Sequence, residues 1–146
     1  MKYAVEYALK APMGGVKLTG GRLKKAFDNN VSFLKGFDVD RMLYWYRVHQ
    51  GKPAPGVPYA SDAGHFENNL KGQTAGEFMM GAGASLLWGE DAELRGMVRR
   101  LLDCIEAGRE SDGFILPITR DEFRTREYPN YTRAWITFGL LDAGYA

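Results

Sequence analysis

Residues 72–88 read Gly72-Gln73-Thr74-Ala75-Gly76-Glu77-Phe78-Met79-Met80-Gly81-Ala82-Gly83-Ala84-Ser85-Leu86-Leu87-Trp88, a pattern that predicts a helix with one buried face. The apolar residues at helical spacing are Ala75, Phe78, Met79, Ala82 and Leu86. Each glycine inside a helix costs about 1 kcal/mol relative to alanine. We therefore expect tight helix packing, or a ligand close to the backbone, to compensate for the glycines of this segment.

Two polar residues of this segment, Gln73 and Glu77, are four positions apart. That spacing places both side chains on one edge of a helix, where they can line a pocket. Glu77 also has a simpler interpretation, as half of an ion pair at a helix end. The sequence leaves both interpretations open.

The segments before residue 72 predict two helices and a long loop. An apolar stripe over residues 23–34 ends at Gly36, and Asp38 can cap a helix that carries Val39, Met42, Leu43 and Tyr46. We expect these two helices to form an antiparallel hairpin, preceded by a short extended segment at residues 16–18. Residues 51–69 are rich in proline and glycine and predict an ordered loop.

Beyond residue 88, Asp91 can cap an amphipathic helix that Gly108 ends. Its apolar positions are Leu94, Met97, Val98, Leu101, Leu102 and Ile105. Residues 113–118 predict an extended or turning segment, and residues 131–145 predict a last helix with Trp135 and Phe138 facing inward.

The amino-acid composition limits the possible binding partners and the possible cellular compartment of the protein. The 146 residues fit one domain, and 19 basic against 18 acidic residues provide no electrostatic footprint for nucleic acid or for a membrane surface. Residues 1–10 lack the uninterrupted apolar run of an export signal, so we expect a cytoplasmic protein. Cys104 is the single cysteine, which excludes an internal disulfide and a site built from several thiolates. We therefore expect no metal in this chain.

Four blocks follow one another along the chain: Val16-Lys17-Leu18, Asp40-Arg41-Met42-Leu43-Tyr44, residues 70–77, and Tyr131-Thr132 with Gly139-Leu140-Leu141-Asp142-Ala143. In this order they resemble the amino-terminal half of the β-L-arabinofuranosidase-like proteins of glycoside hydrolase family 127. The resemblance implies an all-α fold of helical hairpins that form part of an (α/α)6 toroid. Residues 1–146 would be one partial domain, about half of the barrel.

The resemblance also implies where the chemistry lies. In this family, cleavage is attributed to a cysteine thiolate held at a zinc site and to a glutamate that acts as general acid. These groups come later than Ala146, and Cys104 does not take the nucleophile's place. We therefore assign no catalytic residue within this chain, and zinc is expected only in a complete family member.

The chain departs from the family pattern at the pocket helix. Gln73 and Glu77 stand where relatives carry the histidines of a Gly-His-x-x-Gly-His motif. Where relatives often have Tyr-Thr-x-His-Lys, this chain has Tyr131-Thr132-Arg133-Ala134-Trp135. We therefore expect a glycoside other than an arabinofuranoside. The candidate substrate-binding residues are Glu67, Gln73, Glu77, Tyr131 and Arg133.

Three functions agree with these observations. The first is a glycoside hydrolase half that contributes one wall of the sugar pocket. The second is a noncatalytic helical module that binds carbohydrate or a partner helix. The third is a lyase acting on acidic sugars, with Arg133 neutralising the substrate carboxylate and Tyr131 acting as base. The expected partners are carbohydrate and either the remaining half of the barrel or a second copy of the chain.

Overall fold

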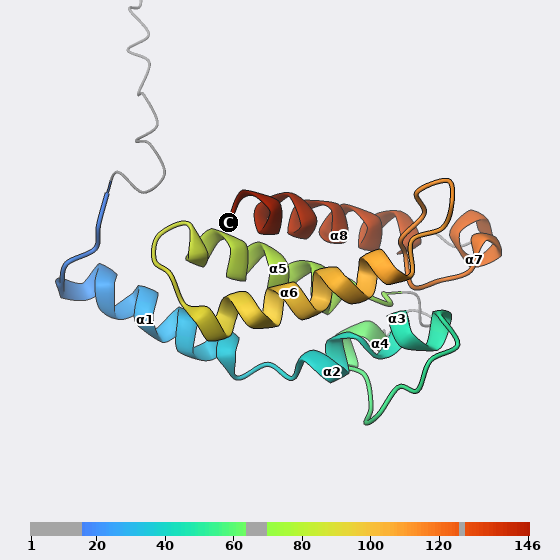
Figure 1. Cartoon of the computed structure of the whole chain (residues 1–146), viewed down its shortest axis with the longest axis horizontal. Helices are drawn as coiled ribbons and strands as arrows, with labels where there is room; N and C mark the ends of the chain where they lie inside the picture. Colours follow the sequence, from blue (N-terminus) through green and yellow to red (C-terminus); the bar gives the residue numbers. More distant parts are fainter. Residues whose placement is uncertain (1–15, 64–69, 126–127) are drawn as a thin grey trace, which may run out of the picture.

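The computed structural model describes residues 16–63, 70–125 and 128–146, which contain eight helices and no strand (Figure 1). The helices are α1 (Gly21–Lys35), α2 (Val39–Met42), α3 (Tyr44–His49), α4 (Ala60–Ala63), α5 (Gln73–Leu86), α6 (Ala92–Ala107), α7 (Arg120–Thr125) and α8 (Tyr128–Tyr145). The all-α prediction is confirmed. Residues 16–18 are irregular backbone, because no second strand pairs with them in the described part of the chain.

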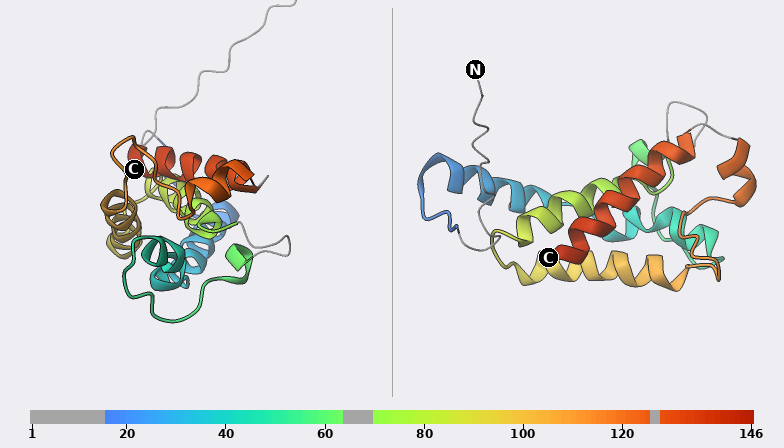
Figure 2. Two further views of the ribbon diagram at one scale, coloured as in Figure 1. Left: turned by 90° about the vertical axis from the view of Figure 1, so that its right-hand side faces the viewer. Right: turned by 90° about the horizontal axis from the view of Figure 1, so that it is seen from above.

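Helix α5 is central, with α8, α6 and the α1–α3 segment around it (Figures 1 and 2). The side chain of Asn30 on α1 donates to Ser85 near the end of α5, while Leu34 lies against Gly81, so α1 runs antiparallel to α5. The α8 helix runs parallel to α5, because Trp135 lies against Gly76 and the later residue Asp142 lies against Gly83. With α6 antiparallel to α5, this arrangement is compatible with successive hairpins of an α/α toroid.

Two glycines of α5, Gly76 and Gly83, are explained by the close approach of α8. A β-carbon on Gly76 would lie 2.6 Å from the backbone of Trp135, and one on Gly83 would lie 2.5 Å from the backbone of Asp142. A β-carbon on Gly139 would collide with the carbonyl oxygen of Gly76. Tight packing therefore compensates for the intrinsic cost of glycine in α5, as the sequence predicted.

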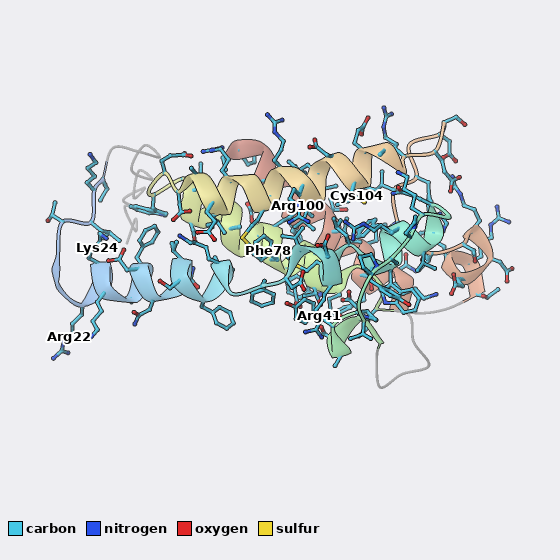
Figure 3. All side chains as sticks on the ribbon, turned by 60° about the horizontal axis from the view of Figure 1, so that its bottom comes forward. Arg22, Lys24, Arg41, Phe78, Arg100 and Cys104 are labelled. Carbon is cyan, nitrogen blue, oxygen red and sulfur yellow. The ribbon has the colours of Figure 1, made fainter. Side chains whose placement is uncertain are left out.

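The buried face of α5 is also the predicted one. Ala75, Phe78, Met79, Ala82 and Leu86 are all buried, and Figure 3 shows Phe78 among the helices while Arg22 projects into solvent. Helix α6 adds Leu94, Val98, Leu101 and Ile105 to the same core. Two predicted caps are confirmed, since Asp38 accepts from the Asp40 amide at 2.8 Å and Asp91 accepts from the Leu94 amide at 2.9 Å.

The predicted hairpin before residue 51 is wrong. Helices α1, α2 and α3 follow one another in one direction along α6 (Figure 1). Lys35 bonds to Asp91 at the start of α6, Arg100 bonds to Asp40 of α2, and Gln50 donates to the carbonyl of Cys104 near the end. The short link of Gly36, Phe37 and Asp38 does not reverse the chain, and within it the Phe37 ring packs against Phe78 of α5, with ring centroids 5.8 Å apart.

The predicted inward face of α8 is also wrong. Phe138 is 54% exposed and Trp135 is only partly buried, whereas Thr132, Ile136 and Gly139 face α5. Apolar residues occur all around α8, so no stripe distinguishes its faces. The contact of Gly139 with Gly76 sets the rotation of α8 and leaves Phe138 in solvent.

Candidate functional site

The amino end of α5 is held by a residue from a different helix. Asp62 of α4 accepts through Oδ1 from the Thr74 amide at 2.9 Å and from the Thr74 hydroxyl at 2.7 Å. Because that hydroxyl donates to Asp62, it accepts from the Ser61 hydroxyl, 2.6 Å away. Gly72, which precedes α5, has a φ of 87°, a left-handed conformation suited to glycine. Asp62 thus supplies the cap that Gly72 cannot.

The Asp62 carboxyl is fully buried, and this burial raises its pKa to about 6 although the Thr74 hydrogen bonds act in the opposite direction. Its second oxygen has no hydrogen-bond partner among the described residues. The Tyr46 hydroxyl is unpartnered as well, and it lies 3.0 Å from where a β-carbon of Gly72 would be. Burial also raises the pKa of Tyr46. Two buried oxygens therefore lack partners beside the start of α5.

These two oxygens belong to a larger set, which we call the α5 entry cluster. Within the described parts of the chain, the buried side-chain atoms without a hydrogen-bond partner are Trp45 Nε1, Tyr46 OH, Arg47 Nη1, Asp62 Oδ2 and Gln73 Oε1. All of them come from α3, α4 and the first residue of α5. An unpaired buried polar atom costs about 1–3 kcal/mol, and those of Tyr46, Asp62 and Gln73 lie at the amino end of α5. Arg47 instead bonds to Asp40 of α2, which also accepts from Arg100 of α6.

The predicted pair Gln73 and Glu77 lies at the same end of α5. Gln73 Nε2 donates to Glu77 Oε1 at 2.8 Å, and Glu77 is exposed while Gln73 is partly buried. The shared edge is therefore confirmed. Glu77 forms no ion pair with any residue that the structure describes, so the simpler interpretation as half of an ion pair finds no partner there.

Lys71 closes the neighbouring side of the cluster. Its ammonium group lies 2.8 Å from Glu122 Oε1 of α7 and 4.8 Å from the centre of the Trp45 ring. A cation over an indole face and beside a carboxylate is held by both. Through these two contacts Lys71 connects the segment that precedes α5 with α3 and with α7.

The remaining predicted site residues are not brought together. Tyr131 is half exposed, and its ring meets Trp135 edge-on at 5.8 Å. Arg133 lies 5.8 Å from the centre of the Phe123 ring and lines a hollow of about 330 Å³ with Arg120. Two positions apart on a helix, Tyr131 and Arg133 point to different sides of α8. Glu67 lies outside the described residues.

Sequence reasoning did not single out Asp62, Thr74 or Ser61. Asp62 and Ser61 lie in the segment that was predicted as a loop, twelve or more residues from their partner Thr74. The one local signal was the absence of a capping side chain at Gly72, which indicates that a distant residue must supply the cap.

The residues that the structure describes do not fit a zinc site. The described residues contain no group of three or more histidine, cysteine, aspartate or glutamate side chains that can hold a metal ion. Cys104 is partly buried, and this burial raises the pKa of its thiol, which disfavours the thiolate that a metal needs.

None of the described helices is long and apolar enough to span a bilayer.

Comparison with known proteins identifies the family. No curated protein and no solved structure matches the chain. The family model described as "Beta-L-arabinofuranosidase, GH127 catalytic domain" matches residues 15–142, which is most of the chain. The same residues include both ends of α5 and most of the α8 helix packed on it. The chain belongs to the family of glycoside hydrolase family 127 catalytic domains.

Proposed function

We propose that residues 1–146 form one partial domain of a glycan-cleaving α/α toroid, and that the amino end of α5 is one wall of its sugar pocket. The observation that supports this proposal is the hydrogen-bonded pair of Gln73 and Glu77, whose Glu77 side chain is exposed at the amino end of α5. An exposed carboxylate beside an amide accepts and donates hydrogen bonds, which suits a ligand rich in hydroxyl groups. The family supports action on a glycan.

Each residue of the wall has a separate role in this proposal. Glu77 accepts hydrogen bonds from sugar hydroxyls, and Gln73 holds the Glu77 carboxylate through its amide nitrogen, 2.8 Å away. Asp62 and Thr74 do not touch the sugar; they fix the first turn of α5 on which Gln73 lies. The bond-breaking groups come from outside this chain, so we expect residues 1–146 alone to release no product from chromogenic arabinofuranosides.

Titration of the isolated chain with the neutral monosaccharides D-galactose and D-xylose, with L-arabinose for comparison, tests the pocket wall and is followed through amide chemical shifts. We expect the Gly76 and Glu77 resonances to move with added sugar, and Glu77→Gln to weaken this response at least tenfold. Asp103→Asn, which changes an exposed carboxylate on α6, is the matched control and leaves it unchanged. An unchanged response in Glu77→Gln would remove Glu77 from the site.

The lyase alternative is less well supported. It requires Tyr131 and Arg133 to act on one substrate, whereas Tyr131 contacts Trp135 and Arg133 contacts Phe123 on another side of α8.

One observation favours the alternative of a noncatalytic helical module that binds a partner helix. Along α8, Ala134, Phe138, Leu141 and Tyr145 are exposed and recur at helical spacing; we call them the α8 stripe.

The α8 stripe supports the proposed protein partner. An apolar helix face of this kind is expected to pack on another helix, either from the remaining half of the barrel or from a second copy of the chain. Phe138, Leu141 and Tyr145 are 54%, 50% and 73% exposed, which is unusual for neighbouring apolar residues on one helix. The pocket wall and the α8 stripe involve different faces, so both can act in one assembly.

A further inference from the structure

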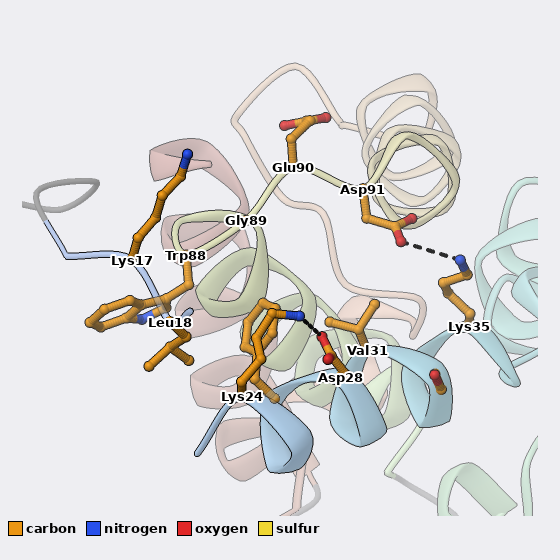
Figure 4. Close-up of a pocket in the computed structure, with 12 residues that line it drawn as sticks. Lys17, Leu18, Lys24, Asp28, Val31, Lys35, Trp88, Gly89, Glu90 and Asp91 are labelled. Atoms are coloured by element: carbon orange, nitrogen blue, oxygen red, sulfur yellow. Dashed lines mark hydrogen bonds and ion pairs between the residues drawn. The ribbon is translucent and has the colours of Figure 1, made fainter. Parts of the chain in front are cut away.

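At the carboxyl end of α5 the chain turns into α6, and this turn meets the first half of α1. The residues there surround a hollow of about 440 Å³, which we call the Trp88 hollow (Figure 4). Lys17 and Leu18 line one part, α1 lines the floor, and residues 88–91 line the rest. A volume of this size suits a small ligand. None of the candidate residues at the amino end of α5 lines it.

The apolar part of the Trp88 hollow is an aromatic surface in contact with solvent. Trp88 is 43% exposed, and Figure 4 shows its ring beside Leu18 at one side of the hollow. Phe27 adds a second ring, close enough that a β-carbon on Gly89 would lie 3.6 Å from it. An exposed indole face supplies large contact area at small entropic cost, which suits the apolar face of a sugar ring.

The charged part of the hollow is balanced by ion pairs. Lys24 pairs with Asp28, and Lys35 lies 3.2 Å from Asp91 (Figure 4). Lys35 also lies 2.8 Å from Glu93. The carboxylates of Glu93 and Asp91 also raise the pKa of Lys35, which keeps it charged. The lining also includes Lys17 and Glu90, so that three lysines face three carboxylates and the hollow has little net field for an ionic ligand. Each pair instead presents a donor and an acceptor side by side.

We propose that the Trp88 hollow is an accessory binding site for a neutral sugar ring. The ring stacks on the Trp88 indole, and its hydroxyls bond to the Lys24–Asp28 and Lys35–Asp91 pairs, which face Trp88 across the hollow. The fourteen residues of α5 put this site about 21 Å from Gln73. That distance exceeds one sugar unit, so the site holds a different part of a glycan than the pocket wall does. The proposal for the Trp88 hollow does not depend on the proposed role of Glu77 in the pocket wall.

Titration of the isolated chain with L-arabinose and with a neutral arabinose trisaccharide tests the site. The amide resonances of Gly89 and Glu90 report on the Trp88 hollow, whereas those of Gly76 and Glu77 report on the pocket wall. We expect Trp88→Ala to weaken the response at Gly89 at least tenfold, and Trp88→Phe to retain part of it because a ring remains. Glu77→Gln should leave the Gly89 response unchanged, so the two proposals fail separately.

A second variant tests the polar contacts. Asp28→Asn removes the carboxylate beside Lys24 while preserving size, and we expect a three- to tenfold weaker response at Gly89. Circular dichroism checks that both variants keep their helices. The proposal is overturned if neither sugar shifts Gly89 up to about 50 mM, or if Trp88→Ala binds as well as the natural chain. Tighter binding of galacturonate than of arabinose would also overturn it, because an anion would then be the ligand.

Discussion

Both ends of α5 are joined to neighbouring helices, but the side chains that make these contacts differ between the two ends. At the amino end, polar groups are buried: Asp62 caps the helix from α4, and the Tyr46 hydroxyl has no described partner. At the carboxyl end, Trp88 is exposed and Lys35 shares its charge with two surface carboxylates. Removing the hydrogen-bond partner of a buried polar group lowers the free energy of unfolding by about 1–3 kcal/mol. A solvated ion pair contributes only about 0–1 kcal/mol to it.

The largest expected effect tests the packing that holds both ends in place. Gly139→Ala puts a methyl group against the Gly76 carbonyl, and a backbone atom cannot rotate away. We expect a loss of at least about 3 kcal/mol in the free energy of unfolding. Gly96→Ala on α6 has nothing within 4 Å and should stabilise the chain by about 0.4–1 kcal/mol. Urea denaturation measures both; similar values for the two would refute the close α5–α8 contact.

The next prediction concerns the pH dependence of the free energy of unfolding, which we expect from the buried Asp62 at the amino end of α5. The pKa of Asp62 is raised to about 6, above the value near 3.8 of the unfolded chain, so the native state binds this proton more tightly. Its stabilising contribution is complete below about pH 4 and is lost as pH rises through 6. Relative to the natural chain, Asp62→Asn should therefore gain on the order of 3 kcal/mol between pH 4 and pH 8.

Asparagine keeps the oxygen that accepts from Thr74, so this substitution preserves the cap while removing the titration. Asp103→Asn changes an exposed carboxyl and should show no such trend. Unfolding by urea at several pH values provides the comparison. Parallel curves for Asp62→Asn and the natural chain would mean that the Asp62 carboxyl does not titrate in this range.

A smaller effect concerns the α8 stripe, which neither end of α5 covers. We expect the isolated chain to self-associate, and Phe138→Lys to weaken this association at least tenfold, about 1.4 kcal/mol. Leu23→Lys alters a residue of α1 that is 73% exposed and lies outside the stripe, so it should have no such effect. Light scattering over a range of concentrations distinguishes the variants. A monomeric natural chain at all concentrations contradicts the prediction.

The smallest effect on stability is expected at the proposed pocket wall. Glu77 is exposed, so Glu77→Gln should change the free energy of unfolding by less than about 1 kcal/mol, while Leu101→Ala in the core should cost about 2–5 kcal/mol. Thermal and urea unfolding measure both. A loss above 2 kcal/mol for Glu77→Gln would show that Glu77 supports the fold instead of the ligand.

The sequence by itself determined the features that depend on neighbouring residues along the chain. The caps at Asp38 and Asp91, the end of α6 at Gly108, and the buried face of α5 were all predicted correctly. Capping joins residues two or three positions apart, and helical periodicity joins residues three or four apart, so both are visible in a linear pattern. The resemblance to the family likewise rested on ordered local blocks.

Only the tertiary structure decided the features that depend on distant contacts. Asp62 caps α5 across twelve residues, the Phe37 ring between α1 and α2 packs against Phe78 of α5, and Gly139 sets the rotation of α8. No local pattern encodes these features, because an apolar residue can face any of several neighbours and a polar one can bond to any group that folding brings near. The close packing of backbones at Gly76, Gly83 and Gly139 selects one arrangement, since there α5 and α8 meet without a side chain between them.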